Sequence, residues 1–196
     1  MVEAPAAFSG GATAIDEATR ARMTSSWRPG CPVPISDLRL VTVTHWGFDA
    51  RPHAGELVVH ADVAEGVIGV FRKAYDARFP IERIELVDVY GGDDDASMAA
   101  NNTSAFNCRA ATGSTRWSEH AYGRAVDINP VQNPYVPRTG GAQPPAGAAF
   151  LDRVDVRPGM LVAGDVVVSG FDALGWGWGG RWSTTKDHQH FSATGR

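Results

Sequence analysis

Apolar and polar side chains alternate in the first part of the chain in a way typical of β-strands. In residues 38–45, Leu38 and Leu40 fall on one face together with two threonines, which is the two-residue period of a strand. Residues 56–60 are predicted to form the partner strand, because the stretch between the two segments contains glycine and proline and has the composition of a turn. We therefore expect these two segments to pair.

The clearest helical signal follows directly after these strands. Apolar residues at three- and four-residue spacing run from Val63 to Tyr75, and Pro80 stops the run. Asp62 is a suitable N-cap, and Glu65 stands three residues further on, as in a capping box. The pattern predicts a helix that begins just after Asp62.

Weaker signals predict the remaining elements. A short helix is expected within residues 15–23, strands over residues 81–90 and 104–111, and a second helix over residues 166–174. Proline and glycine dominate residues 133–147, which we expect to form an irregular surface excursion. One further strand is predicted close to the C-terminus.

Strands before, between and after the helices predict an α+β fold, in which helices pack on one small, mostly antiparallel sheet. A chain of 196 residues suits one domain with a sizeable core. Residues 1–30 are rich in alanine, glycine, serine and threonine and are broken by Pro29-Gly30. We expect them to be a loosely ordered arm, and residues 31–196 to form a single domain.

The composition is that of an ordinary soluble globular protein and excludes some classes of partner. Hydrophobic residues make up 43% of the chain and charged residues 20%. The net charge of −4 offers no general attraction to nucleic acid or to an anionic membrane, and no run approaches the roughly 18 apolar residues of a transmembrane helix. The first residues lack the basic and apolar regions of a signal peptide. We therefore expect either a cytosolic protein or a form whose export signal has been removed.

Two cysteines, Cys31 and Cys108, leave two interpretations open. They are either separate buried thiols, or one disulfide that ties the N-terminal arm to the predicted strand at residues 104–111. The disulfide would close a long loop and could add on the order of 4 kcal/mol to the stability. It would also imply an oxidising compartment.

Two segments carry candidate metal chemistry. The sequence SEHAYGRAVDI contains His120 and Asp127, and the sequence DHQHF, on the predicted final strand, contains Asp187, His188 and His190. Together they offer imidazoles and carboxylates suited to a catalytic zinc site, which uses three protein ligands and leaves a fourth position open. One carboxylate would be spare and could act on a metal-activated water.

The spacing of the first segment requires the chain to fold back on itself. Seven residues of straight strand would separate His120 from Asp127 by roughly 23 Å, whereas zinc ligands lie about 2 Å from one ion. Gly123 readily adopts positive φ and can make the turn. Residues 125–128 then have the pattern of a short, buried strand that carries Asp127.

These two segments resemble the signatures of the M15 zinc peptidases. SEHAYGRAVDI resembles the family's SxHxxGxAxD signature, and DHQHF resembles its closing motif, a carboxylate three residues before the last zinc-binding histidine. The likeness is closest to the D-alanyl-D-alanine carboxypeptidase-like branch and extends over about residues 38–192. It implies an M15/hedgehog-type D,D-peptidase-like fold and one zinc ion held by His120, Asp127 and His190. It also implies Asp187 as the general base, where many members have Glu.

The strand period and the resemblance disagree about the second segment. In a regular strand His188 and His190 point to one face and Asp187 to the other, so periodicity alone selects the two histidines as ligands. The resemblance instead selects Asp187 and His190, which needs a turn or an irregular start to the strand at residues 187–189. We adopt the assignment that the resemblance implies.

Further candidates surround the two segments. M15 enzymes place an arginine upstream of the first histidine to stabilise the oxyanion. Arg109 is the best match, although a solvent-facing strand arginine explains it equally well. Ser118 is a candidate to hydrogen-bond the substrate or to orient a ligand. Trp178 is a candidate substrate-binding wall, against the alternative that it lies in the core. The acids at residues 93–95 are interpreted as a solvated turn rather than as a second metal site.

The resemblance implies zinc-dependent hydrolysis of peptide bonds in peptidoglycan stem peptides, of D,D-carboxypeptidase, L,D- or D,D-peptidase type. Asp187 would take a proton from the metal-activated water. We expect the stem peptide as partner, no nucleic acid, no transmembrane segment, a monomeric protein, and an extracytoplasmic or secreted location. Two alternatives stay open: a non-catalytic, zinc-stabilised module that binds cell-wall peptides, and a zinc hydrolase of a non-peptide amide.

Overall fold

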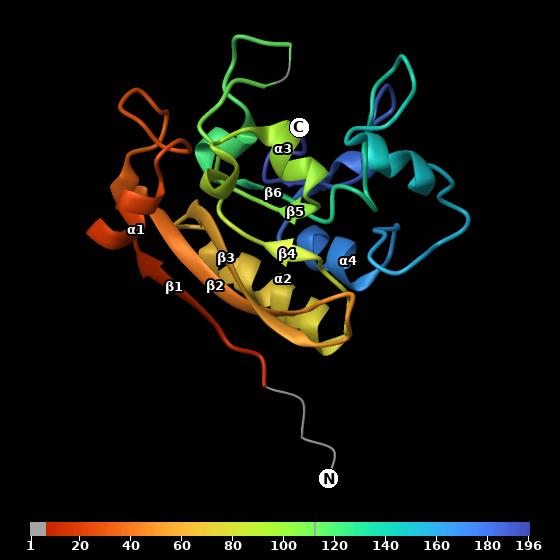
Figure 1. Cartoon of the computed structure of the whole chain (residues 1–196), viewed down its shortest axis with the longest axis horizontal. Coiled ribbons are helices and arrows are strands. Elements are labelled where there is room, and N and C mark those ends of the chain that lie inside the picture. Colours follow the sequence, from red (N-terminus) through yellow and green to blue (C-terminus); the bar gives the residue numbers. More distant parts are fainter. Residues whose placement is uncertain (1–6, 112) are drawn as a thin grey trace.

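The computed structural model describes residues 7–111 and 113–196, which form an α+β fold built from short strands and a few helices (Figure 1). The helices are α1 (Glu17–Arg22), α2 (Ala64–Asp76), α3 (Asp94–Ala99) and α4 (Val166–Ala173). The strands are β1 (Gly10–Ala14), β2 (Leu38–Trp46), β3 (Pro52–His60), β4 (Arg83–Ile84), β5 (Asn102–Thr103), β6 (Ala125–Asp127), β7 (Tyr135–Val136), β8 (Gly177–Trp178), β9 (Lys186–Asp187) and β10 (His190–Ser192).

The larger sheet has the order β1-β2-β3 and is antiparallel throughout. Strands β2 and β3 form a long hairpin whose register runs from the Leu38–His60 pair to the Trp46–Pro52 pair. The inward side chains of β2, such as Val41, are fully buried, whereas Thr42 is exposed. The pairing predicted from the alternating pattern is therefore confirmed.

Helix α2 lies against this sheet and buries one apolar face, which includes Val67 and Phe71. The predicted helix is present, but Asp62 does not cap it. The N-cap is Val63, which makes no side-chain cap hydrogen bond, because the Asp62 carboxylate is engaged by His60 and Arg124.

Helix α4 packs on α2 and continues the core toward a second small sheet. Asp165 caps α4 by accepting hydrogen bonds from the backbone N–H groups of Val167 and Val168 at 2.8 and 2.7 Å, as the sequence suggests for a helix that starts after Asp165. Phe171 of α4 stacks on Phe191 of β10, with ring centroids 4.2 Å apart. One hydrophobic core thus connects the two sheets.

The second sheet has the order β6-β10-β8 and is antiparallel, and it joins the two candidate motifs. Two smaller pairs, β4 with β5 and β7 with β9, complete the pairing among the described residues. The α+β prediction is confirmed. The expected single sheet is instead divided, because the strands in the second half of the chain are only two or three residues long.

Two predicted strands are mostly absent. Within residues 81–90, only β4 is a strand, and Val87–Tyr90 is a 3₁₀ helix. Residues 104–111 form isolated bridges rather than a strand, since their backbone groups bond to scattered partners such as Val58 and Ser26. Apolar periodicity does not distinguish such an extended, buried segment from a strand in a sheet.

Part of the arm predicted over residues 1–30 forms regular structure. Strand β1 pairs with β2 over five residues, and Met23, which follows α1, is fully buried. Strand β1 joins the sheet through backbone hydrogen bonds to the edge of β2. Such pairing does not require an apolar pattern in the sequence of β1. Residues 1–6 lie outside the described part, and the division at residue 30 stays a prediction.

Cys31 and Cys108 form a disulfide with Cα atoms 5.8 Å apart. Of the two interpretations left open by the sequence, the disulfide is therefore the one observed. It fastens the N-terminal segment to the chain just before Arg109. None of the helices in the described residues is long and apolar enough to cross a membrane.

Candidate metal centre

The first motif folds into a tight turn that carries His120 inward. Ser118 caps a 3₁₀ helix, Glu119–Tyr122, and its hydroxyl accepts a hydrogen bond from the His120 backbone N–H. Gly123 ends the helix with a φ of 67°, a conformation that glycine adopts without strain. The chain then enters β6, which ends at Asp127. This is the fold-back that the spacing requires.

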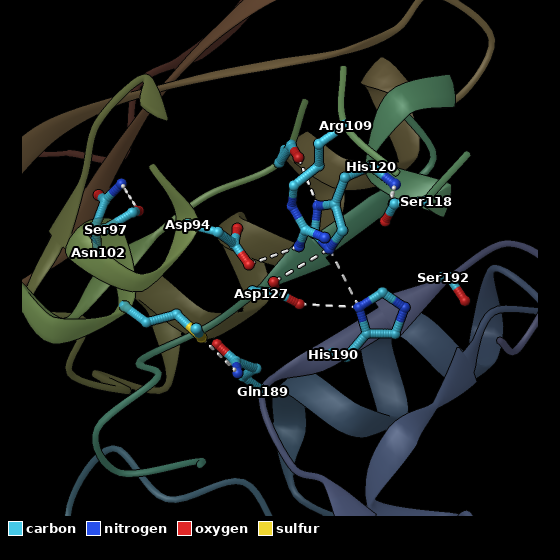
Figure 2. A network of polar contacts seen from close by, with 12 residues as sticks. Asp94, Ser97, Asn102, Arg109, Ser118, His120, Asp127, Gln189, His190 and Ser192 are labelled. Atoms are coloured by element: carbon cyan, nitrogen blue, oxygen red, sulfur yellow. Dashed lines mark hydrogen bonds and ion pairs between the residues drawn. The ribbon is translucent and has the colours of Figure 1, made fainter. Parts of the chain in front are cut away.

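The second motif meets the first through strand pairing. In the antiparallel register of β6 and β10, His190 lies opposite Asp127. Asp127 Oδ1 is 2.9 Å from His190 Nδ1, and Asp127 Oδ2 is 3.1 Å from His120 Nε2. The two ring nitrogens are 3.3 Å apart. All three side chains are buried and point toward one another (Figure 2).

Backbone carbonyls fix the orientation of both imidazoles. His120 Nδ1 is 2.6 Å from the carbonyl oxygen of Ala105, and His190 Nε2 is 2.9 Å from that of Arg196. A ring nitrogen facing a carbonyl must carry a proton, so it is the other nitrogen of each ring that faces Asp127 and is available to a metal ion. The two nitrogens and the carboxylate converge at about 3 Å, and a positive charge between them stabilises this arrangement.

The donor set and its spacing fit zinc. Tetrahedral ligands about 2 Å from one ion lie about 3.3 Å from each other, close to the separations of 2.9–3.3 Å found here. Two imidazoles and one carboxylate are a ligand set that catalytic zinc sites use. The group could therefore hold a metal ion through His120 Nε2, an oxygen of Asp127 and His190 Nδ1.

The pKa values show the same demand for a cation. Burial alone would raise the pKa of Asp127, but the charges and hydrogen bonds of His120 and His190 bring it well below its usual range. Burial alone would lower the pKa of His190, but the hydrogen bond and charge of Asp127 raise it to about 9. The pocket thus favours a positive charge at the point where the three side chains meet.

A bend separates Asp187 from His190. Strand β9 ends at Asp187, residues 188–189 bend, and β10 starts at His190. Because of this bend, Asp187 and His190 line the same cavity while His188 does not. The irregular start that the resemblance requires is present, and it removes the alternation expected for a regular strand.

Asp187 and His188 have different surroundings. Burial raises the pKa of Asp187 to about 7, and the nearby negative charge of Asp127 adds to this against the opposing charge of His190. Asp187 Oδ1 is buried without a hydrogen-bond partner. The ring of His188 packs near Trp178, with centroids 6.1 Å apart, and burial lowers its pKa to about 4.

The cavity that contains the three converging side chains has a volume of about 740 Å³. Arg109 and Asp94 line one part of it, and Arg109 Nη2 donates to Asp94 Oδ2 at 2.7 Å. Ser118 is buried in its wall. The cavity is large enough for several residues of an extended ligand, and His120 and Asp127 line it.

The segment that carries this site is similar to a known family. Residues 112–193 match the family model of the M15 peptidases that is described as D-alanyl-D-alanine carboxypeptidase. This match supports an M15-type peptidase over these residues. No curated protein and no solved structure gave a match.

The M15 segment contains most of the predicted site residues, namely Ser118, His120, Asp127, Trp178, Asp187 and His190. The candidate oxyanion residue, Arg109, lies three positions before the matched segment. Its place in the cavity therefore rests on the structure, which sets its guanidinium beside Asp94 rather than in open solvent (Figure 2).

Trp178, which was predicted to bind substrate, lies in the core and does not line the cavity. Its side chain is 7% exposed and belongs to the hydrophobic core, and its indole N–H donates to the His188 carbonyl at 2.8 Å. Trp182 lines the cavity of the M15 segment instead, with its ring centroid 5.7 Å from that of His190. Strand β8 turns Trp178 into the core, and the 3₁₀ helix that follows turns Trp182 out of it.

Asp94 and Gln189 are among the cavity residues that were not identified from the sequence. Asp94 was interpreted as part of a solvated turn. Asp93 does cap α3, but Asp94 is partly buried against Arg109, and burial raises its pKa. Gln189, inside the M15 motif, also lines the cavity. Gln189 lies between Asp187 and His190 in the sequence, and this position could have indicated that it lines the cavity. Nothing in the sequence around Asp94 indicates its place in the cavity.

Proposed function

We propose that this protein is a zinc-dependent peptidase that hydrolyses peptide bonds in peptidoglycan stem peptides. The observation that carries the proposal is the convergence of His120, Asp127 and His190, with a fourth polar side chain, Asp187, in the same cavity. A structural zinc site has no use for a spare carboxylate, because its four positions are closed by protein ligands.

In this proposal His120, Asp127 and His190 hold one zinc ion. When bound, zinc supplies Lewis-acid polarisation of the scissile carbonyl and acidifies water at the site. The Ala105 and Arg196 carbonyls keep the two imidazoles in the tautomers that coordination needs. Ser118 supports the same geometry by fixing the His120 backbone.

Asp187 is proposed as the general base and acid. The Gln189 side chain hydrogen-bonds the Asp187 carboxyl group, but Asp187 Oδ1 has no hydrogen-bond partner among the described residues. This oxygen is therefore available to take a proton from the attacking water and to deliver it to the leaving amine. Burial raises the pKa of Asp187 in the metal-free protein to about 7. This upward shift favours a group that both takes and delivers a proton, since proton transfer is most efficient when the pKa lies near the working pH.

Arg109 is proposed to stabilise the oxyanion that develops on the scissile carbonyl. Its guanidinium lines the cavity, and Asp94 holds one of its terminal nitrogens while its Nε has no partner among the described residues. A fixed cation that needs no rearrangement during the reaction lowers the barrier effectively.

The stem-peptide substrate is supported by the family description. An extracytoplasmic or secreted location is supported by the Cys31–Cys108 disulfide, since disulfides persist in oxidising compartments. That the protein acts as a monomer stays a prediction.

The proposal is tested by the masses of the products that zinc-loaded protein releases from a defined stem peptide ending in D-Ala-D-Ala. Loss of one terminal residue would identify a carboxypeptidase, whereas internal cleavage would identify an endopeptidase. If no defined stem peptide is cleaved, the peptidase proposal is wrong.

A further inference from the structure

Gln189 carries a buried acceptor that no described group satisfies. The side chain is 2% exposed and lines the cavity next to His190. Its Nε2 lies 3.4 Å from the sulfur of Met98, and its Oε1 is buried without a hydrogen-bond partner. A thioether sulfur can only accept, so the amide nitrogen faces Met98 and the oxygen is the group left free.

Other unpaired polar atoms border the same cavity. Arg109 Nε and Asp187 Oδ1 are also buried without partners. Buried polar groups in folded proteins are paired in the great majority of cases, so unpaired groups that share one cavity indicate where a ligand makes its hydrogen bonds. The proposed chemistry uses Arg109 and Asp187. The Gln189 side chain also hydrogen-bonds the Asp187 carboxyl group and so opposes the rise in the pKa of Asp187 that burial causes, but this leaves Gln189 Oε1 without a partner.

The fold does not need the Gln189 side chain for strand pairing. The link between β6 and the start of β10 is made by the backbone, through the hydrogen bond from Ile128 N–H to the Gln189 carbonyl at 3.0 Å. The contact with Met98 is weak, because a thioether is a poor acceptor. An amide in this place is therefore not explained by the stability of the sheet.

We propose that Gln189 binds the substrate by accepting, at Oε1, a hydrogen bond from a backbone N–H of the peptide other than that of the scissile bond. The inference rests on the proposed peptidase function and adds a substrate-binding residue to it. The donor is a neutral N–H rather than an ammonium group, because an ammonium would be drawn to the carboxylates of Asp127 and Asp187 that border the same cavity.

The first test is Gln189→Met, a substitution that keeps an unbranched side chain beside Met98 and removes the acceptor. In zinc-loaded protein, KM for a stem peptide should rise about 3- to 10-fold, the effect of one neutral hydrogen bond, with zinc content unchanged. Any change in kcat reports the lost hydrogen bond to Asp187 and is measured separately. Gln132→Met is the matched control, since Gln132 lies outside the cavity and accepts from Asn101 at 2.8 Å. It should leave KM unchanged.

The second test removes the donor from the substrate. Each non-scissile amide of the peptide is replaced in turn by an ester. Wild-type protein should lose about 3- to 10-fold in kcat/KM at one position, and Gln189→Met should lose nothing further there. This scan can overturn the inference even if the variant folds poorly, because wild-type protein must show at least one sensitive position.

The outcomes separate this inference from the function on which it rests. If wild-type protein cleaves the peptide but tolerates every ester, or if Gln189→Met equals wild type, the role of Gln189 is wrong and the peptidase function stands. If wild-type protein cleaves no peptide, both fail together.

Discussion

Asp187 and His188 are neighbours in the chain with opposite surroundings, and the difference comes from one bend. The carboxyl group of Asp187 borders the cavity with a pKa of about 7, whereas the ring of His188 lies against Trp178 with a pKa of about 4. At the scale of single residues, we therefore propose that Asp187 transfers the proton and that His188 contributes to packing.

Asp187→Asn should lower kcat about 10²- to 10⁴-fold, the usual contribution of a general acid or base, while the zinc content stays at that of wild type. Asparagine keeps the size of the side chain, so the effect reports the lost proton transfer. The measurement is kcat on a stem peptide, with bound zinc determined on the same samples.

The neighbouring substitution His188→Phe is the matched control. It keeps an aromatic ring beside Trp178 and should retain both zinc and turnover. The assignment would be reversed if His188→Phe lost zinc while Asp187→Asn turned over normally. If Asp187→Asn kept full activity with zinc bound, the site would hold zinc without using Asp187.

His188 should also make the stability of the zinc-free protein depend on pH. Its pKa falls from 6.5 to about 4 because burial disfavours the charged ring. Between pH 6.5 and about pH 4, His188 is protonated in the unfolded state but neutral in the folded state. The contribution of His188 is thus fully present above pH 6.5 and is lost as the pH falls toward about 4.

The free energy of unfolding of His188→Phe, relative to wild type, should therefore increase as the pH falls from 6.5 to about 4 and stay constant above pH 6.5. Denaturant unfolding in the presence of a chelator measures this difference without a contribution from zinc loss. A difference that does not change with pH would mean that His188 is not held neutral by burial.

The sequence predicted the three residues that meet at the candidate metal centre, and it did so through motif spacing and resemblance. It did not predict Asp94 or Gln189. The place of Asp94 depends on how α3 packs beside Arg109, and that of Gln189 depends on the bend before β10. Neither relation has a local signature in the chain.

At the scale of elements, the turn at Gly123 is the feature that brings the first motif to the second. A Cβ atom at this position would lie 2.7 Å from the backbone nitrogen of His60, and the backbone has a φ of 67°. The Gly123 carbonyl also accepts a hydrogen bond from His60 N–H at 2.8 Å. The turn is therefore pressed against β3, with no room for a side chain.

Gly123→Ala should lower the free energy of unfolding by more than the about 1–2 kcal/mol that positive φ costs an alanine, and it should weaken zinc binding because the turn carries His120. Gly91→Ala is the matched control, since Gly91 has a φ of 66° and no atom within 4 Å of an added Cβ. The two variants are compared by urea unfolding and by competition for zinc with a chelator. Equal losses of stability, with unchanged zinc affinity, would contradict the packed turn.

Periodicity predicted the longest elements, whereas the short strands of the site were predicted only through the motifs that they carry. Helix α2 and strand β2 have clear periodicity over nine or more residues. The strands that build the site, such as β6 and β10, have only three residues each. So few positions carry no usable period, and their pairing is set by tertiary contacts.

At the scale of the whole molecule, the N-terminal segment supports the wall of the cavity. Beyond the Cys31–Cys108 disulfide, Cys108 N–H donates to the Ser26 carbonyl at 2.9 Å, and Arg28 donates to the Cys108 carbonyl at 2.9 Å. These contacts hold the chain immediately before Arg109. Composition suggested a loose arm here because it reports apolar content and not backbone pairing or a covalent link.

Replacing both cysteines by alanine should lower the free energy of unfolding by about 4 kcal/mol, because the disulfide closes a loop with a sequence separation of 77 residues and so restricts the unfolded chain. Urea unfolding of the variant and of oxidised wild type measures the difference, with reduced wild type as the control. A loss below about 1 kcal/mol would show that the non-covalent contacts of the N-terminal segment suffice.

The central claim is that His120, Asp127 and His190 hold a zinc ion on which peptide hydrolysis depends. The most direct test is to strip the protein with a chelator and to follow hydrolysis of a stem peptide as zinc is added back. The account predicts no turnover without zinc, a linear rise of activity up to one equivalent of zinc per chain, and a plateau beyond it. Turnover that persists in the stripped protein, or that never returns with zinc, would contradict the account.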